Sequence, residues 1–271
     1  MPVANSDIIV YGAANMPETD AATPVGGAID RTIKIQNLDM SDVGGTDTLE
    51  VVSSSGADTT QTITVTGRNA SGIIVTDSFV LTGATPVNGT TSFQRVLKIV
   101  SSGALAGTVT VREASGNVTL ATLEGTTTAP GGTSVLEVRR PFYAAKANPS
   151  GGATKELYEK VFIANTHASL AVTDATVELT VDGTTNDLVD FDLEDAVNDT
   201  GTITDRTTAP GGAQTVRDSW SDALVNVPGG SLGDRVTGTS DHIGVWLQLT
   251  LPDGENPENV SITLNVGGST T

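Results

Sequence analysis

The chain has 271 residues with 32 acidic and 14 basic side chains, a formal net charge of −18 and no cysteine. Nucleic-acid binding depends on Lys and Arg replacing phosphate counterions, so this charge disfavours direct contact with DNA or RNA. The lack of cysteine excludes disulfides, thiolate nucleophiles and Cys-ligated zinc. Aromatic residues are only 4%, glycines number 30, and Thr, Val and Ser are abundant, which favours many short strands over long helices. An all-β fold is therefore predicted.

Residues 1–30 contain one apolar run, Ile8, Ile9, Val10 and Tyr11, followed by polar sequence with Pro and Gly. This pattern predicts an extended N-terminal arm that binds a partner by adding a strand to a neighbouring sheet edge. The segment has neither a basic n-region nor an apolar h-region, and no window approaches 18 apolar residues. We therefore expect no signal peptide and no membrane contact, and synthesis in a host cytoplasm.

Residues 31–138 predict a first β-domain. Strand patterns follow one another steadily, and the clearest lies at residues 62–83, "TITVTGRNASGIIVTDSFVLTG". Two runs of alternating Val, Ile, Thr and Phe flank a short Gly-containing loop, which is typical of an antiparallel hairpin. A second hairpin is expected to turn through Ser115, Gly116 and Asn117. About seven strands at this spacing indicate a β-sandwich or barrel-like domain.

Residues 139–157 are predicted to be a connector, because Pro149, Gly151 and Gly152 interrupt the strand patterns. Five of the 14 basic residues fall in the 22 positions that begin here: Arg139, Arg140, Lys146, Lys155 and Lys160. In an acidic chain, such a strip is either a solubilising hinge or a docking strip for an acidic partner. On the second interpretation, Arg139, Arg140 and Lys146 are candidate partner-binding residues.

Residues 158–271 predict a second β-domain, so that the whole chain is expected to hold two tandem sandwich or barrel-like domains behind the arm. In "HIGVWLQLTLP", residues 242–252, Ile243 and Val245 begin an apolar face that continues through two leucines. The alternate positions hold Gly, Trp, Gln and Thr, which indicates a half-buried strand.

No pattern in the chain predicts a catalytic, cofactor or metal site. The acidic run 187–199 lacks the Gly and Glu positions of a calcium loop, and its alternating Asp190, Asp192 and Glu194 predict a solvated strand face. The two histidines, His167 and His242, are expected at a turn and at the start of a strand, without a nucleophile elbow nearby. Trp220 and Trp246 are interpreted as core or interface anchors rather than as a sugar-binding platform.

The segment "ITVTGRNASGIIVTDSFVLTGATPVNGTTSFQRVLKIVSSG", residues 63–103, resembles a pattern found in virion structural proteins of tailed bacteriophages. In the second half, "YEKVFIANTHASLAVTDATVELT", "TDRTTAPGG", "NVPGGSLGD" and "IGVWLQLTLPDGE" are similar to blocks of another phage structural module. The segments cover most of the chain and contain no active-site motif.

This resemblance implies a non-enzymatic capsid decoration (cement) protein. Such a protein would sit on the outer capsid of the virion, contact the major capsid protein and further copies of itself as a homo-oligomer, and stabilise the shell. A different virion component, such as a tail, connector or fibre-associated protein, is the alternative. A carbohydrate-binding module is a third interpretation.

Overall fold

The computed structural model describes residues 2–19, 22–38, 46–142, 152–182, 189–212, 215–217, 220–236, 240–254 and 261–270. Its regular structure is almost entirely β, which confirms the predicted fold class. The helical turns of the described residues are three short 3-10 segments, η1 (Asn5–Asp7), η3 (Pro130–Gly132) and η4 (Pro228–Gly230). Within the described part of the chain, no helix has the length and apolar character needed to cross a membrane.

The chain divides into two compact units. The first consists of residues 31–143 and is called the continuous unit here. The second combines residues 1–30 with residues 144–271 and is called the split unit. Strand β2 (Val25–Ile35) spans the division, because its first residues belong to the split unit and its last to the continuous unit.

The continuous unit is built from two sheets. One has the strand order β2, β10 (Glu137–Arg139), β7 (Arg95–Ser101), β4 (Thr62–Arg68) and β5 (Ile74–Val80). The other has the order β6 (Val87–Asn88), β3 (Leu49–Ser53), β8 (Val109–Glu113) and β9 (Thr119–Leu123). Both hairpins expected from the sequence are present as β4–β5 and β8–β9.

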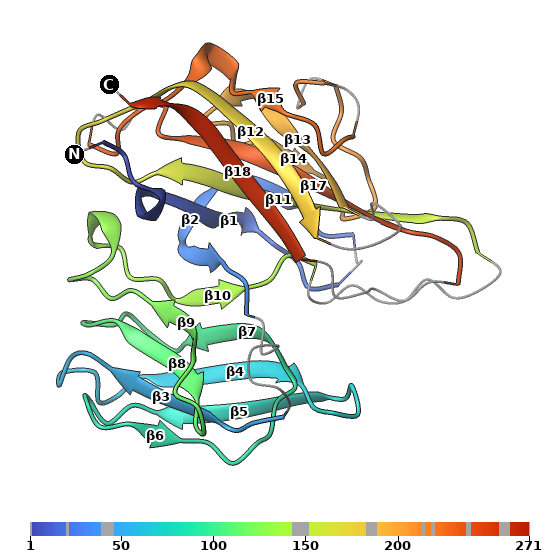
Figure 1. The fold of residues 1–271 in the computed structure, drawn as a ribbon. Helices are drawn as coiled ribbons and strands as arrows, with labels where there is room; N and C mark the ends of the chain where they lie inside the picture. Colours follow the sequence, from blue (N-terminus) through green and yellow to red (C-terminus); the bar gives the residue numbers. More distant parts are fainter. Residues whose placement is uncertain are drawn as a thin grey trace. The chain divides into compact units, whose positions relative to one another are not determined.

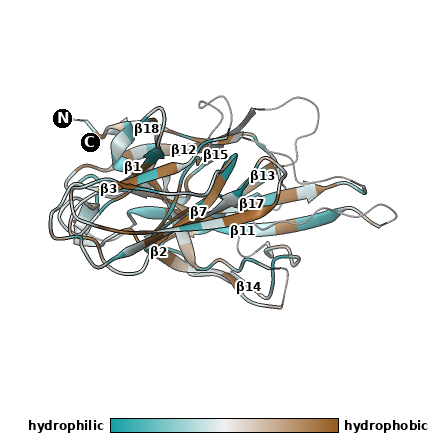
Figure 2. Ribbon diagram, turned by 90° about the horizontal axis from the view of Figure 1, so that it is seen from below, coloured by the Kyte–Doolittle hydropathy of each residue, from teal (hydrophilic) through white to brown (hydrophobic). Residues whose placement is uncertain are grey.

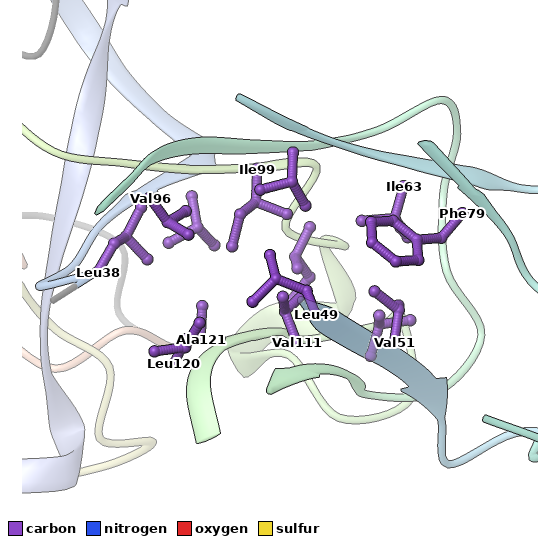
Figure 3. Close-up of a cluster of buried hydrophobic side chains, with 14 of the residues drawn as sticks. Leu38, Leu49, Val51, Ile63, Phe79, Val96, Ile99, Val111, Leu120 and Ala121 are labelled. Atoms are coloured by element: carbon purple, nitrogen blue, oxygen red, sulfur yellow. The ribbon is translucent and has the colours of Figure 1, made fainter. Parts of the chain in front are cut away.

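The core of the continuous unit lies between its two sheets. Every second residue of β4 is buried, and β3 and β8 show the same alternation, as expected for strands with one face on a core. Figure 3 shows Val96 and Ile99 on one side pointing toward Leu49 and Val111 on the other. Each of these side chains is fully buried. A packed apolar layer therefore stabilises this unit.

The split unit also contains two sheets. The larger has the order β13 (Val189–Val197), β17 (His242–Leu251), β11 (Lys155–Asn165), β1 (Ile8–Asn15) and β2, with β14 (Thr202–Ile203) paired to β2. The smaller is centred on β12 (Val172–Asp182), which pairs with β15 (Val225–Asn226), β16 (Ser231–Leu232) and β18 (Ser261–Thr270). Figure 1 shows β12 and β18 side by side.

Two sequence expectations about the split unit need correction. Residues 8–15 do not form a separate arm: as β1 they pair with β11, from Ile8 opposite Asn165 to Gly12 opposite Val161, and β2 follows on the other side. Strand β17 is not half-buried, because Trp246 and Gln248 are buried as well as Ile243 and Val245. The hydrophobic segments of β11 and β17 are visible in Figure 2.

Candidate functional site

The hairpin of β4 and β5 has one buried face and one accessible face. Ile63, Val65 and Phe79 point into the core of the continuous unit. The strands are in register from Thr62 opposite Val80 to Arg68 opposite Ile74, and alternation places the intervening residues on the other side of the sheet. This second face is partly or fully exposed and carries the following side chains: Thr62, Thr64, Thr66 and Arg68 from β4, and Ile74, Thr76, Ser78 and Val80 from β5. We call it the Thr/Ser face.

The composition of the Thr/Ser face differs from that of the chain as a whole. Its outward positions on β4 and β5 hold hydroxyl and apolar side chains with one arginine and no carboxylate. On the neighbouring β7, Lys98 lies opposite Thr66 and Arg95 lies opposite Arg68, which adds two further cations. Since the chain carries a net charge of −18, these outward positions of β4 and β5 lack the acidic repulsion expected elsewhere.

The margin of the Thr/Ser face is apolar. Ile74 is 51% exposed and Val80 is 57% exposed, and they stand at opposite ends of β5. Ile73, in the hairpin turn, is 61% exposed. Strand β5 is the last in its sheet order, so this apolar margin follows an edge strand. Exposed edges of this kind can pair with another chain.

The side chain of Asp77 holds the segment after β6 against β5. The Oδ2 atom of Asp77 accepts hydrogen bonds of 3.0 Å from the backbone N–H groups of Thr90 and Thr91. Burial opposes ionisation of this carboxyl, but the hydrogen bonds from Thr91, Ser78 and Thr90 outweigh it and lower the pKa of Asp77. These bonds fix the core-facing side of β5, whereas its outward positions are exposed.

The apolar run that the sequence predicts as a partner-binding segment is not an exposed surface. Ile8, Ile9 and Val10 are half-buried, and Tyr11 is buried, all within a strand that has neighbours on both sides. The expectation that this run adds to a partner's sheet is therefore wrong for the folded chain, because its backbone already pairs with β11.

The basic strip is dispersed in a similar way. Arg139 is only 3% exposed, in β10 beside Glu137, so its expected role in docking is wrong. Arg140 is half-buried and donates a hydrogen bond of 3.2 Å to Asn37. Lys160 is fully buried, and Lys146 lies outside the described residues. Among the described cations, Arg139 and Lys160 are therefore not available for docking.

The acidic run also differs from the expected solvated face. Asp192 and Glu194 are buried, although Asp190 is half-buried as an outward residue would be. Arg217 contacts Asp192 through its backbone N–H at 3.0 Å and its Nε at 3.3 Å. The partners of these carboxylates come from distant parts of the chain, which is why alternation alone suggested a solvent-facing strand.

Glu194 belongs to a buried ionic cluster centred on Lys160 of β11. The Nζ atom of Lys160 lies 2.5 Å from Glu194 Oε1, 2.9 Å from Asp199 Oδ1 and 3.2 Å from the carbonyl oxygen of Gly201. The indole N–H of Trp246 donates a hydrogen bond of 2.7 Å to Glu194. Ligand oxygens of Glu194, Asp195 and Asp199 lie within 4.8 Å of one another, but the Lys160 ammonium supplies the positive charge at this place.

The pKa values of Glu194 and Asp199 are shifted in opposite directions. Burial raises the pKa of Glu194 to about 7, with Lys160 opposing the shift and Asp199 adding to it. For Asp199, burial is opposed by hydrogen bonds from Lys160 and from the backbone of Gly201, and the net effect lowers the pKa. Near neutral pH, the cluster therefore holds a proton that Glu194 can give or accept.

The histidines and tryptophans lie where the sequence predicted. His167 stabilises a turn, because its Nδ1 atom accepts hydrogen bonds from the backbone N–H groups of Ser169 and Leu170. His242 is the first residue of β17, with Nδ1 2.6 Å from Asp241. Trp246 is fully buried, and Trp220 packs on Tyr158 with 5.2 Å between ring centroids.

The geometry thus defines an all-β protein with an accessible Thr/Ser face on one unit and a closed ionic cluster in the other. No protein-family model, curated protein or solved structure matches the chain.

Proposed function

We propose that the protein is a non-enzymatic structural protein of a tailed-phage particle that binds the outer capsid surface and stabilises the shell. The observation that carries the proposal is the Thr/Ser face, together with the phage-like sequence of residues 63–103 that builds it. The proposed partner is the major capsid protein, and further copies of the chain would occupy equivalent positions on the particle.

The physical argument rests on the charge and side-chain composition of this face. A densely acidic protein placed in many copies on a shell needs a contact surface without its own acidic repulsion. The face provides hydroxyl groups for hydrogen bonds and three cations, Arg68, Arg95 and Lys98. Ile74 and Val80 add apolar area that loses water on contact. Such an interface would stabilise the shell through many identical weak contacts and would need no catalytic residue.

Binding to capsids tests the proposal. The purified chain is mixed with shells assembled from the major capsid protein of the same phage, and the bound fraction is measured by sedimentation. We expect saturable binding at a copy number comparable to that of the capsid protein. A few copies per particle would favour the alternative, a tail, connector or fibre-associated component. No binding to the shell would refute the decoration role.

A matched pair of variants tests the face itself. Ile74→Glu combined with Val80→Glu places two carboxylates on the Thr/Ser face. Val118→Glu is the control, because Val118 is 40% exposed in the same unit but lies in the β8–β9 loop. Losing two buried apolar contacts of about 1.5 kcal/mol each predicts roughly 100-fold weaker binding for the double variant. Equal weakening by the control, or none by the double variant, would show that another surface makes the contact.

A further inference from the structure

The buried cluster of Lys160, Glu194 and Asp199 has the arrangement needed to form a covalent bond. We propose that the Lys160 amine and the Asp199 carboxyl condense into an intramolecular isopeptide bond, with Glu194 transferring the proton. The bond would join β11 to the turn after β13. This inference does not depend on the proposed function.

The reacting groups are held together by the fold. Lys160 lies on a central strand, and its side chain is fully buried. Its ammonium is 2.9 Å from Asp199 Oδ1. Well-oriented groups held by a fold can reach effective concentrations of about 10⁵–10⁸ M, far above those of free amines and acids. Condensation that is unfavourable in bulk water therefore becomes accessible inside the folded chain.

Two glycines make room for the lysine side chain. A Cβ atom at Gly244 would lie 2.7 Å from Lys160 Cε and 2.5 Å from Glu194 Cγ. A Cβ atom at Gly26 would lie 3.1 Å from Lys160 Cδ and 2.9 Å from the ring of Trp246. The backbone of two further strands thus closes over the lysine, and a side chain at either position would displace it.

Aromatic side chains, rather than water, surround the lysine ammonium. The ring centroids of Phe162 and Trp246 lie 5.1 Å and 5.3 Å from Lys160 Nζ. Buried charges carry a large desolvation cost, and a lysine with two carboxylates leaves one charge uncompensated unless a carboxyl is protonated. Conversion of an ammonium and a carboxylate into an amide removes both charges from this interior.

Glu194 is placed to transfer protons. Its Oε1 atom is 2.5 Å from Lys160 Nζ and is fixed by Trp246, while its Oε2 atom is buried without a hydrogen-bond partner. With its pKa raised to about 7 by burial, Glu194 exists in both protonation states at neutral pH. A group of this kind can take a proton from the amine and return it to a leaving oxygen.

Asp199 is the acceptor because its carboxyl is polarised and accessible. The backbone N–H of Gly201 donates a hydrogen bond of 2.5 Å to Oδ1, where negative charge develops as the amine adds to Cγ. The side chain of Asp199 is 24% exposed, whereas that of Glu194 is fully buried. The oxygen released from Asp199 therefore has a route to solvent.

The reaction balances without any external reagent. Nζ forms a bond to Cγ of Asp199, and the bond from Cγ to Oδ2 breaks. The ammonium supplies three hydrogens: one stays on the amide nitrogen and two leave with Oδ2 as water, one of them by way of Glu194. The products are one secondary amide and one water molecule.

Mass spectrometry of the full-length protein tests the inference directly. We expect the denatured chain to be lighter than its sequence by one water molecule, and a proteolytic digest to contain a branched peptide that joins Lys160 to Asp199. An unchanged mass would overturn the proposal, and a branch from Lys160 to Glu194 would overturn the assignment of Asp199.

An internal control comes from Lys34 and Glu124. Their atoms are 2.6 Å apart, but both side chains are partly exposed, at 18% and 21%. We expect this pair to remain unlinked in the same digest. A cross-link between Lys34 and Glu124 would show that proximity alone is enough for the bond to form. It would contradict the roles proposed for burial and for Glu194.

Two variants test the roles proposed for Asp199 and Glu194. Asp199→Ala should have the full sequence mass, because the acceptor carbon is gone. Glu194→Gln should form the bond about 100-fold more slowly or more, as expected on loss of a general acid–base group. Circular dichroism checks that each variant is folded. A folded Glu194→Gln chain that is fully cross-linked when first isolated would refute the proton-transfer role, whereas the wild-type mass decides on the bond even if both variants fail to fold.

Discussion

Replacing Gly67 by Ala should destabilise the continuous unit, because β4 packs there directly against backbone. A Cβ atom at this position would lie 2.3 Å from the carbonyl oxygen of Arg95 and 2.6 Å from Cδ1 of Phe93. Such contacts need at least 3.0 Å, so β4 and β7 would have to separate by about 0.7 Å in a close-packed interior. Neither neighbour can yield easily, since Phe93 is fully buried and β7 pairs with β4 on this side.

The expected size of the effect follows from the cost of overpacking. Inserting one methyl group into a packed core costs about 1–3 kcal/mol, and in a unit of this size each kcal/mol lowers the melting temperature by about 4 °C. We therefore expect a decrease of about 4–12 °C in the transition of the continuous unit. Thermal unfolding followed by circular dichroism measures it, and hydrogen exchange in β4 and β7 locates it.

Gly103 provides the matched control. A Cβ atom at Gly103 would contact nothing within 4 Å, so Gly103→Ala should leave the melting temperature unchanged or raise it slightly through a less flexible unfolded chain. If Gly67→Ala melts no lower than the control, the close approach of β4 to β7 is not present in solution, and the register of the hairpin that carries the Thr/Ser face would have to be revised.

Two further predictions concern the buried polar groups. Burial, with the hydrogen bond to Glu156, raises the pKa of Tyr158 to about 12; in an alkaline absorbance titration, Tyr158→Phe should remove an ionisation near pH 12. Because the pKa is raised in the folded state, this phenol contributes stability below pH 10 that is lost as the pH rises through about 12. Arg206→Met should lower the unfolding free energy by about 3–5 kcal/mol, since Arg206 and Glu159 form a fully buried pair at 2.9 Å. Arg112→Met, which removes the partly exposed pair with Glu50, should cost less than about 1 kcal/mol in the same denaturant titration; equal costs for the two variants would contradict the role of burial.

The sequence allowed the strands to be predicted where the pattern is local. In residues 62–83, alternation and a Gly-containing loop define both strands and the turn, and the structure forms the hairpin at Thr62–Arg68 and Ile74–Val80. The outward Thr and Ser positions follow from the same alternation. Their significance as an acid-free face became clear only when β7 was placed beside β4, since Lys98 joins the face through that pairing.

The buried charges could not be predicted from local patterns. Asp192 and Glu194 alternate as solvent-facing residues do, and their cations, Arg217 and Lys160, are 25 and 34 positions away in sequence. Only the pairing of β13 and β11 with the same neighbour, β17, brings Lys160 to Glu194. Sequence proximity places Lys160 with the basic residues near the connector, but it gives no information about the strand face on which a lysine lies.

The N-terminal run offers the most direct test of how the split unit is held together. Strand β1 joins β11 across about 150 residues of chain, with Tyr11 2% exposed and Ala13 fully buried. Deleting residues 1–16 would remove every pairing of β1 and leave one edge of β11 open. Because these contacts belong to the core of the split unit and not to a partner, we expect this unit to unfold or aggregate while the continuous unit keeps its own transition.

A truncated chain that stays folded would support a different role for the N-terminal run. A truncated chain that retains both transitions but loses capsid binding would restore the interpretation of Ile8, Ile9, Val10 and Tyr11 as an assembly arm. Adding the peptide of residues 2–16 in trans distinguishes the cases further, since a free β11 edge should capture it and recover the lost transition. Recovery of folding by the peptide would show that β1 completes its own sheet. Recovery of capsid binding without any change in folding would show instead that the segment bridges the chain to its partner.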